Sequence, residues 1–397
     1  MIDRSKIWTG TLNETAGAPI PGARHVGLYD TTLRDGEQTV GVVLSPEDKL
    51  EIAKALDAAG VDRIEAGFPR VSDDDWRAVE LISAAGLRAE IWGFSRAVPA
   101  DAEALVELGV QASVIEGPVS EGKLAAYGLT RETMLERITK AVSFACDHGI
   151  RVCFFGVDSS RADPDFYRQV YEAAVEAGAA EVAVVDTIGI ATPEAAAYLV
   201  GRTREWLGAE IPVHWHGHDD FGLGTAAAVA AVREGASWVH GTINGMGERA
   251  GNADLVEVAM TLEALYGVTT NLDFLQARGL AELVQQRSGY PLAPWKPVTG
   301  DTLFTRESGA VASQFHDPPA IEPFSSELVA APRRIVLGKK SGLDSVRIRA
   351  AELGIALSDD QVAPLLAAVK ARGIATRALV DDDEFRRLAA DVPRSVD

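Results

Sequence analysis

The feature that most constrains the fold is a regular alternation of apolar strand and amphipathic helix between residues 26 and 265. No antiparallel segment interrupts it. Eight βα units in about 240 residues match the size of a closed (β/α)8 barrel, which we predict over residues 26–285. A doubly wound open sheet is the main alternative. The expected strands are Val26–Tyr29, Asp62–Ala66, Arg88–Gly93, Val110–Ile115, Arg151–Phe155, Glu181–Val185, Ile211–Trp215 and Trp238–Ile243.

The segments on either side of this alternation differ in composition. Residues 1–25 are polar and rich in Gly and Pro, and they lack the order of a secretion signal, so we interpret them as a flexible leader. Helical periodicity returns around Leu343–Leu353 and Asp359–Ala371. We therefore expect residues 286–397 to form an appended, largely helical subdomain that covers a barrel mouth.

Charge and cysteine content narrow the classes of function. The formal net charge is −20, so we expect no broad basic face for nucleic acid. No apolar run is long enough to span a bilayer, so we expect no membrane partner. The two cysteines, Cys146 and Cys153, do not indicate a disulfide framework, which favours a cytoplasmic protein.

Polar side chains gather at the predicted strand ends. Arg34 and Asp35 follow the first strand, and His216 and His218 end the seventh. Residues two apart on a strand face the same way, so the carboxylate and the two imidazoles are typical of a divalent-metal site. The carboxyl ends of barrel strands meet at the rim where active sites lie. Because Arg34 adds a fixed positive charge, we predict a metal-assisted reaction on a small acid.

The same rim carries further candidates. Glu65 ends the second strand, Thr187 ends the sixth, and Asn244–Asn252 follows the eighth. Phe155 shares a strand face with Val157, so it either lines a substrate pocket or packs the barrel interior. Chance placement would scatter such groups over both ends of the barrel.

Five segments carry distinctive motifs: Asp30–Gln38, Ile64–Pro69, Asp186–Gly189, His216–Leu223 and Gly245–Ala253. They resemble the pyruvate-carboxyltransferase-like acyltransferases, which include the homocitrate, isopropylmalate and citramalate synthases. Ser160–Phe166 is similar to the nitrogen-fixation type of homocitrate synthase in particular. The related lyases of the same barrel superfamily are more distant.

The resemblance implies a metal site and a reaction. Asp35, His216, His218 and Asn252 would be the ligands of Mg²⁺, Mn²⁺, Zn²⁺ or Co²⁺. The implied reaction is a Claisen-type condensation of acetyl-CoA with a 2-oxo acid, in which the metal acts as a Lewis acid and CoA is released. A homodimer, with the appended subdomain as lid and dimerisation element, follows by analogy alone.

The resemblance also implies substrate contacts. Arg34 would hold the substrate oxygens and stabilise the developing alkoxide, and Thr187 would bind a carboxylate. From the same motifs we take Glu37 as a candidate catalytic residue, and Gln38 and Glu65 as candidate substrate-binding residues.

Several acid–base positions depart from the family pattern. His214 stands where homocitrate synthases usually carry Glu, Arg306 stands in place of a proposed catalytic His, and Val157 replaces a common Glu. His214 would transfer protons or be a core histidine, and Arg306 would bind extra negative charge or form a surface ion pair. A more positive pocket would suit a 2-oxo dicarboxylate or a phosphonate-bearing 2-oxo acid.

Four functions therefore remain open. The first is a homocitrate synthase-like enzyme, and the second is a specialised-metabolism synthase of the phosphonomethylmalate type. The third is a metal-dependent C–C lyase, and the fourth is a non-catalytic relic that still binds metal.

Overall fold

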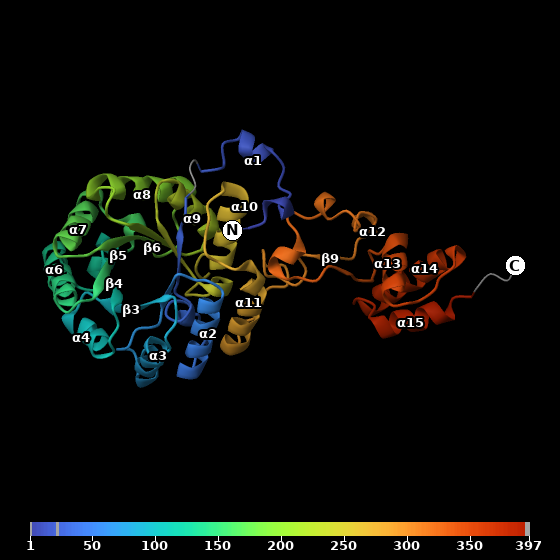
Figure 1. Ribbon diagram of the computed structural model, residues 1–397, viewed down its shortest axis with the longest axis horizontal. Helices are drawn as coiled ribbons and strands as arrows, with labels where there is room; N and C mark the ends of the chain where they lie inside the picture. The colour runs from blue at the N-terminus through green and yellow to red at the C-terminus, as the bar shows by residue number, and fades with distance from the viewer. Residues whose placement is uncertain (1, 21–23, 394–397) are drawn as a thin grey trace. The chain divides into compact units, whose positions relative to one another are not determined.

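The computed structural model describes residues 2–20 and 24–393. The chain divides into two compact units (Figure 1). The larger consists mainly of residues 11–292, and the smaller consists of residues 3–10 together with the chain from residue 293 onward. Each unit has its own core.

Eight parallel strands close into a barrel in the larger unit, in chain order from β1 to β8. The ring closes where β1 pairs with β8 and Tyr29 lies opposite His240. This confirms the predicted barrel and excludes the doubly wound sheet. The strands are β1 (Gly27–Asp30), β2 (Arg63–Glu65), β3 (Glu90–Arg96), β4 (Ala112–Pro118), β5 (Arg151–Val157), β6 (Glu181–Asp186), β7 (Val213–Gly217) and β8 (Trp238–Gly241).

Helices surround the barrel and begin where local chemistry favours a start (Figure 1). Ser45 accepts a hydrogen bond from the backbone of Asp48 in a capping box, and Pro46 occupies the first turn. Pro164 and Pro193 hold the same place in their helices. The helices of this unit are α1 (Leu12–Thr15), α2 (Pro46–Ala58), α3 (Asp73–Ser83), α4 (Pro99–Glu107), α5 (Glu121–Ala126), α6 (Arg131–Asp147), α7 (Pro164–Glu176), α8 (Pro193–Leu207), α9 (Gly224–Arg233), α10 (Leu255–Tyr266) and α11 (Phe274–Ser288), with 3₁₀ turns η2 (Gly36–Gln38), η3 (Ser159–Arg161) and η4 (Ile243–Gly245).

One helix of the larger unit, α11, was not predicted, because the sequence pattern indicated only that the alternation of strand and helix ends there. Its buried face relies on Ala277 and Ala281 beside Phe274, Leu280 and Val284. Small residues give a weak periodic signal, which explains the missed helix. Among the described residues, no helix has the length and apolar character needed to cross a bilayer.

The barrel interior has an ionic layer where the strands begin. Arg63 pairs with Glu181 at 2.6 Å and with Glu90 at 3.0 Å. Its guanidinium lies 3.5 Å from the centroid of the Trp238 ring and 4.6 Å from that of Trp92. Above this layer lies an apolar cluster formed by Tyr29, Trp92, Phe94, Ala112, Val114, Cys153, Phe155, Val157, Ala183 and Val185.

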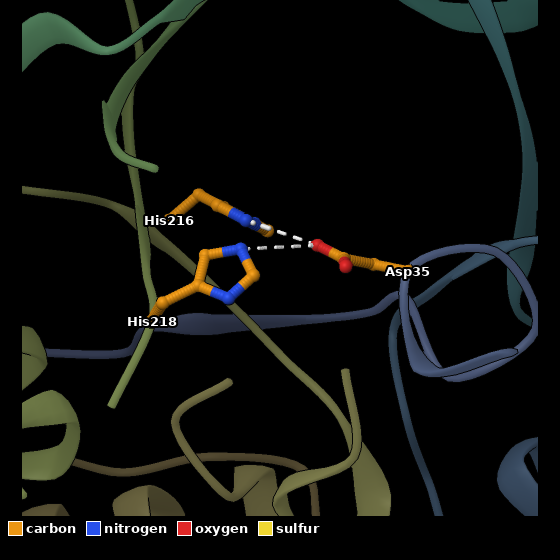
Figure 2. Close-up of side chains that lie close together, drawn as sticks. All are labelled: Asp35, His216 and His218. Carbon is orange, nitrogen blue, oxygen red and sulfur yellow. Dashed lines mark ion pairs between the residues drawn. The ribbon is translucent and has the colours of Figure 1, made fainter. Parts of the chain in front are cut away.

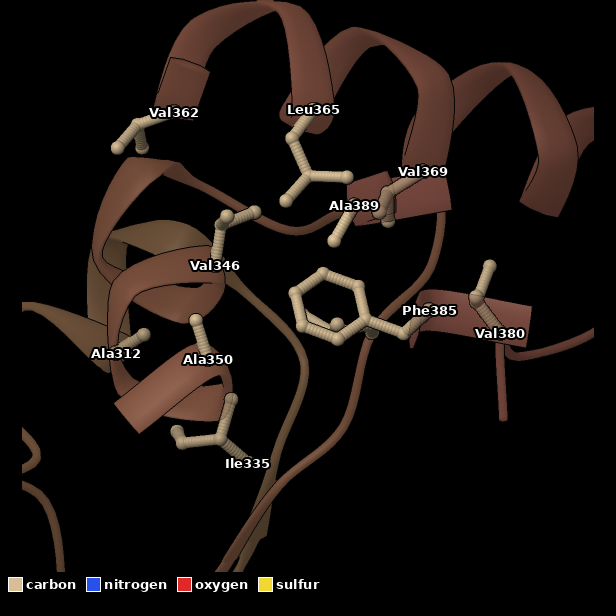
Figure 3. Close-up of a cluster of buried hydrophobic side chains, with 11 residues drawn as sticks. Ala312, Ile335, Val346, Ala350, Val362, Leu365, Val369, Val380, Phe385 and Ala389 are labelled. Atoms are coloured by element: carbon tan, nitrogen blue, oxygen red, sulfur yellow. The ribbon is translucent and has the colours of Figure 1, made fainter. Parts of the chain in front are cut away.

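The smaller unit is largely helical, as predicted for the appended region. A parallel pair of short strands, β9 (Thr305–Arg306) and β10 (Arg334–Ile335), accompanies the helices. Figure 3 shows Phe385 at the centre of its core, between side chains of α13 and α14. The helices are α12 (Gly309–Ala312), α13 (Leu343–Glu352), α14 (Asp359–Thr376) and α15 (Asp382–Asp391), with turns η1 (Arg4–Lys6), η5 (Pro318–Ala320) and η6 (Ser326–Val329).

Part of the N-terminal segment belongs to this smaller unit. Ile7 forms an antiparallel bridge with Phe324, and the backbone of Trp8 donates to the carbonyl of Pro323 at 2.8 Å. Residues 1 and 21–23 of the predicted leader lie outside the described residues.

Candidate active site

A carboxylate and two imidazoles converge at the carboxyl end of the barrel. Asp35 follows β1, His216 lies in β7, and His218 follows β7 directly. Asp35 Oδ2 lies 3.3 Å from His216 Nε2 and 3.6 Å from His218 Nε2 (Figure 2). One potential ligand atom from each residue falls within 4.8 Å of the others, so the three could hold one cation.

The protonation states of this triad suit metal binding. Burial alone would raise the pKa of Asp35, but Arg34 and the two imidazoles hold that pKa below its usual range. Burial lowers the pKa of His218 to about 4, although Asp35 opposes the shift. At neutral pH the carboxylate is therefore ionised and His218 is neutral, which are the forms that ligate metals.

Several buried polar atoms at the triad have no hydrogen-bond partner among the described residues. They are Asp35 Oδ1, Asn252 Oδ1, and the Nδ1 atoms of His216 and His218. Burying polar atoms unsatisfied is costly, so such a cluster fits a bound cation and its ligands. The donor set of two nitrogens and two oxygens suits a divalent metal.

A glycine-rich turn after β8 brings Asn252 to the triad. The backbone of Asn252 bridges to His218, and its Nδ2 donates to the carbonyl of Met246 at 3.0 Å. Its Oδ1 has no partner in the part of the chain that the structure describes. Gly251 has φ +86°, and an added Cβ would lie 1.8 Å from the carbonyl oxygen of Gly245. Only glycine fits there.

Arg34 is fixed beside the triad. Its Nε donates to Glu65 at 2.7 Å, its Nη1 lies 3.6 Å from Asp35 Oδ2, and its Cζ lies 4.2 Å from the centroid of the Phe94 ring. Glu65 also accepts from the hydroxyls of Tyr29 and Thr31. Buried Arg34 Nη2 has no partner among the described residues, so one donor remains for a ligand.

Glu37 and Gln38 lie in the turn that follows Asp35. Glu37 forms an ion pair with Lys49 at 2.5 Å and accepts from the backbone of Leu44 at 2.8 Å. Both residues border a cavity of about 320 Å³ beside Arg34. The cavity is otherwise lined mainly by apolar side chains: Leu33, Val42, Val43, Phe68, Val71 and Phe94, with Asp75.

Phe155 lies in β5, and Thr187 directly follows the neighbouring strand β6 at the same rim. The Phe155 ring centroid is 4.9 Å from that of His216 and 6.5 Å from that of Phe94. The hydroxyl of Thr187 accepts a hydrogen bond from the backbone of Asp158 at 2.8 Å. Phe155 therefore shields one side of the triad from water, whereas Thr187 is tied to the end of β5.

His214 lies below the triad, inside the barrel. Its Nε2 lies 2.6 Å from Glu181 and its Nδ1 lies 2.9 Å from His240. Burial lowers the pKa of His214, and Glu181 opposes the shift. Both ring nitrogens are thus engaged within the ionic layer.

Arg306 belongs to the smaller unit. It donates to the carbonyls of Leu303, Thr305 and Ile321, and its Nη2 lies 3.9 Å from Glu322. Burial lowers its pKa, with Glu322 opposing the shift. Backbone carbonyls therefore take up most of its donors.

Glu116, which the sequence motifs did not single out, lies on the inward face of β4 near its carboxyl end. The ladders place it opposite Arg96 on β3 and Phe155 on β5. A signal was available, because a lone acid after the apolar run Val114–Ile115 resembles the placement of Glu65.

Two family profiles together match most of the chain. The profile of the HMGL-like family matches residues 25–284, and that of the homocitrate synthase post-HMGL domain-like family matches residues 298–376. A putative (R)-citramalate synthase of Methanopyrus kandleri is 41% identical, over 92% of this chain and 72% of the relative. A homocitrate synthase of the same organism is 40% identical, over 93% of this chain and 92% of the relative.

The fold also matches a solved structure. The crystal structure of an HMG-CoA lyase from Brucella melitensis superposes with a TM-score of 0.60 at 22% identity, over 68% of this chain and all of that chain (100%). This likeness concerns the fold alone. The two synthases are nearly equally similar to the chain although they are named for different products.

Proposed function

Because the chain belongs to the HMGL-like family, as its motifs predicted, and is an enzyme of the acyltransferase type found there, we propose that it condenses acetyl-CoA with a 2-oxo acid. The product is a 2-hydroxy acid extended by a carboxymethyl group, and hydrolysis of the thioester releases CoA. The observation that carries the proposal is Arg34, which lies beside the triad of Asp35, His216 and His218 and whose Nη2 has no partner among the described residues.

The metal would be held by the triad, with Asn252 Oδ1 as a further ligand. When bound, the metal polarises the carbonyl group of the 2-oxo acid. The residues around it orient the substrate and exclude water. We propose no preference among Mg²⁺, Mn²⁺, Zn²⁺ and Co²⁺.

Arg34 acts on the carbonyl oxygen of the acceptor. As the new C–C bond forms, negative charge develops on that oxygen, and Nη2 donates a hydrogen bond to it. Glu65 fixes the guanidinium through Nε, so we propose that it orients Arg34 as well as bordering the substrate. Phe94 and Phe155 lower the local dielectric constant and so strengthen this interaction.

The acceptor in the homocitrate-like reaction is 2-oxoglutarate, which we propose as the first to test. A specific observation favours a second candidate, a short 2-oxo monocarboxylate such as pyruvate. The cavity beside Arg34 is lined by Phe68, Phe94 and four other apolar side chains. His214 and Arg306 are engaged with other groups, so they lend little support to a phosphonate-bearing acceptor.

The test measures acceptor-dependent release of CoA thiol with Mn²⁺ or Mg²⁺. The panel holds 2-oxoglutarate, oxaloacetate, 2-oxoisovalerate, pyruvate and phosphonopyruvate. We expect release with at least one acceptor, its loss in Asp35→Ala, and its retention in Asp147→Ala, which changes an exposed carboxylate at the end of α6. Cleavage of a hydroxy acid without thiol release would favour the lyase, and metal binding without turnover would favour the relic.

We further propose that the enzyme is a homodimer and that the subdomain of residues 286–397 acts as lid and dimerisation element. This proposal rests on the family resemblance. Light scattering after size exclusion should give twice the chain mass of 42.2 kDa. A monomer at micromolar concentration would contradict it.

A further inference from the structure

The carboxyl group of Glu116 stands apart from its neighbours at the barrel mouth. Glu65 is bonded to Tyr29, Thr31 and Arg34, and Glu37 is paired with Lys49. Among the described residues, no donor lies within hydrogen-bond or ion-pair distance of Glu116, although its side chain is partly buried. A carboxyl group left free in such a place is available to a substrate.

Glu116 points toward the reaction site. Side chains alternate along β4, and Ala112 and Val114 belong to the apolar cluster inside the barrel, so Glu116 lies on the same inward face. It is the last of these toward the carboxyl end. Its ladder partner Phe155 touches His216, with ring centroids 4.9 Å apart. Glu116 therefore lies on the strand next to Phe155, the side chain that contacts His216 of the triad.

Opposing effects of burial and of neighbouring charges place the pKa of Glu116 near neutral pH. Burial raises its pKa to about 7, Arg34 and Arg96 act against the shift, Glu65 adds to it, and Lys123 opposes it weakly. These charged groups act on Glu116 from the β1 turn, β2, β3 and α5. Tyr127, the residue that follows α5, is a further titratable neighbour, whose own pKa is raised by burial and by Glu116. A group with a pKa near the working pH can accept and return a proton.

The proposed condensation needs a base to remove a proton from the methyl carbon of acetyl-CoA. His214 has both ring nitrogens engaged, and Glu65 has three partners, so neither is free. Val157, at the end of β5, cannot take a proton. We infer that Glu116 is the general base that deprotonates acetyl-CoA, and this inference rests on the proposed function.

The step balances as follows. The methyl C–H bond breaks, the proton passes to a carboxylate oxygen of Glu116, and the electron pair forms the enolate of the thioester. That pair then makes the C–C bond to the carbonyl carbon of the 2-oxo acid, the carbonyl oxygen takes up a proton from solvent water, and Glu116 returns its proton to solvent. Water later cleaves the thioester and releases CoA.

The test compares Glu116→Gln with Glu116→Asp, and uses Glu103→Gln on α4 as the exposed carboxylate control. The base works when ionised, so kcat of the native enzyme should fall as the pH drops through about 7. We expect Glu116→Gln to lower kcat about 10²- to 10⁴-fold and to abolish this acidic limb, with the KM of the acceptor nearly unchanged. Glu116→Asp should retain part of the activity, and Glu103→Gln all of it.

Two further measurements exclude a merely structural effect. Circular dichroism and Mn²⁺ affinity should be the same in all variants. With trideuterated acetyl-CoA, the isotope effect on kcat should be larger in Glu116→Gln than in the native enzyme, because proton removal becomes rate-limiting.

The outcomes distinguish a failure of this inference from a failure of the proposed function. A native enzyme without acceptor-dependent thiol release overturns the proposed function and this inference together. An active native enzyme whose Glu116→Gln variant keeps its kcat and acidic limb overturns the inference alone. The same holds if only the KM of the acceptor changes, because Glu116 would then recognise the acceptor.

Discussion

Arg34 keeps its charge although it is buried, and its neighbours fix its guanidinium in one orientation. Burial would lower its pKa, but Glu65 and Asp35 raise that pKa above its usual range, so the guanidinium stays charged. Three of its atoms are held by Glu65, Asp35 and the face of Phe94, while Nη2 has no partner among the described residues. A flat, rigid guanidinium can make these contacts at once, whereas an ammonium group cannot.

We therefore expect Arg34→Lys to lower kcat about 10²- to 10³-fold, the effect of removing one preorganised oxyanion donor. Mn²⁺ affinity should change only a few-fold, because Arg34 is not a ligand. Arg131→Lys, on an exposed face of α6, is the matched control. Steady-state thiol release measures the first effect, and Mn²⁺ titration the second. Near-native kcat in Arg34→Lys would show that Nη2 does not meet the reacting oxygen.

At the scale of elements, the turn between β8 and α10 builds one side of the candidate metal site. Gly247 donates its backbone N–H to the hydroxyl of Thr39, which ties this turn to the one after β1. Asn252 then bonds back to Met246 and bridges to His218. The turn therefore orients Oδ1 of Asn252 through backbone contacts, and its shape depends on Gly251.

Gly251→Ala should weaken Mn²⁺ binding about 10- to 100-fold, the usual effect of disturbing the groups that orient a ligand. The added Cβ would lie 1.8 Å from the carbonyl oxygen of Gly245, so the turn must move. Gly222→Ala is the control, because Gly222 also has positive φ (+70°) but open space around it. Isothermal titration of both variants checks the prediction, and equal affinities would contradict it.

At the scale of the whole molecule, two kinds of core stabilise the chain. The barrel interior joins an ionic layer around Arg63 and Glu181 to an apolar layer above it. The smaller unit relies on apolar packing around Phe385, where α13, α14 and α15 meet. We therefore expect a change of pH to alter mainly the stability of the barrel. Loss of apolar volume in the smaller unit should destabilise that unit alone.

Glu181→Gln should lower the free energy of unfolding of the barrel at pH 7 on the order of 3 kcal/mol. Burial alone would raise the pKa of Glu181, but His214 and Arg63 lower it to about 2, below its ordinary 4.5. A lowered folded-state pKa stabilises the fold above pH 4.5 and loses this effect as the pH falls toward 2. Native barrel stability should therefore drop over this window, and that of the variant should drop less.

Denaturant unfolding followed by tryptophan fluorescence measures this effect, since Trp92 and Trp238 flank Arg63. Glu176→Gln, an exposed carboxylate at the end of α7, is the control. An equal pH dependence in Glu181→Gln and the native protein would refute the assigned role of the pair.

Phe385→Ala should destabilise the smaller unit by about 3–5 kcal/mol, because a buried aromatic side chain leaves a cavity. Hydrogen exchange should accelerate across α13, α14 and α15, and should stay unchanged in the barrel strands. Leu343→Ala is the control, since Leu343 is 43% exposed. Accelerated exchange in both units would contradict independent cores.

Local patterns in the sequence determined the barrel and the type of its candidate site. The alternation of strand and helix sets which faces must be buried, and the spacing of His216 and His218 lets both imidazoles point the same way at the end of β7. Both are properties of neighbouring residues, so one chain is enough to predict them. α11 was missed because its buried face is built partly from alanine.

Only the tertiary structure decided which side chains are engaged and which are free. His214 meets Glu181, 33 residues away, and Arg34 meets Glu65, 31 residues away, because barrel closure brings distant strands together. The same closure leaves the Glu116 carboxyl group without a hydrogen-bond or ion-pair partner among the described residues. Burial, charge and hydrogen bonding at a site depend on groups from several strands, and no local pattern encodes those distances.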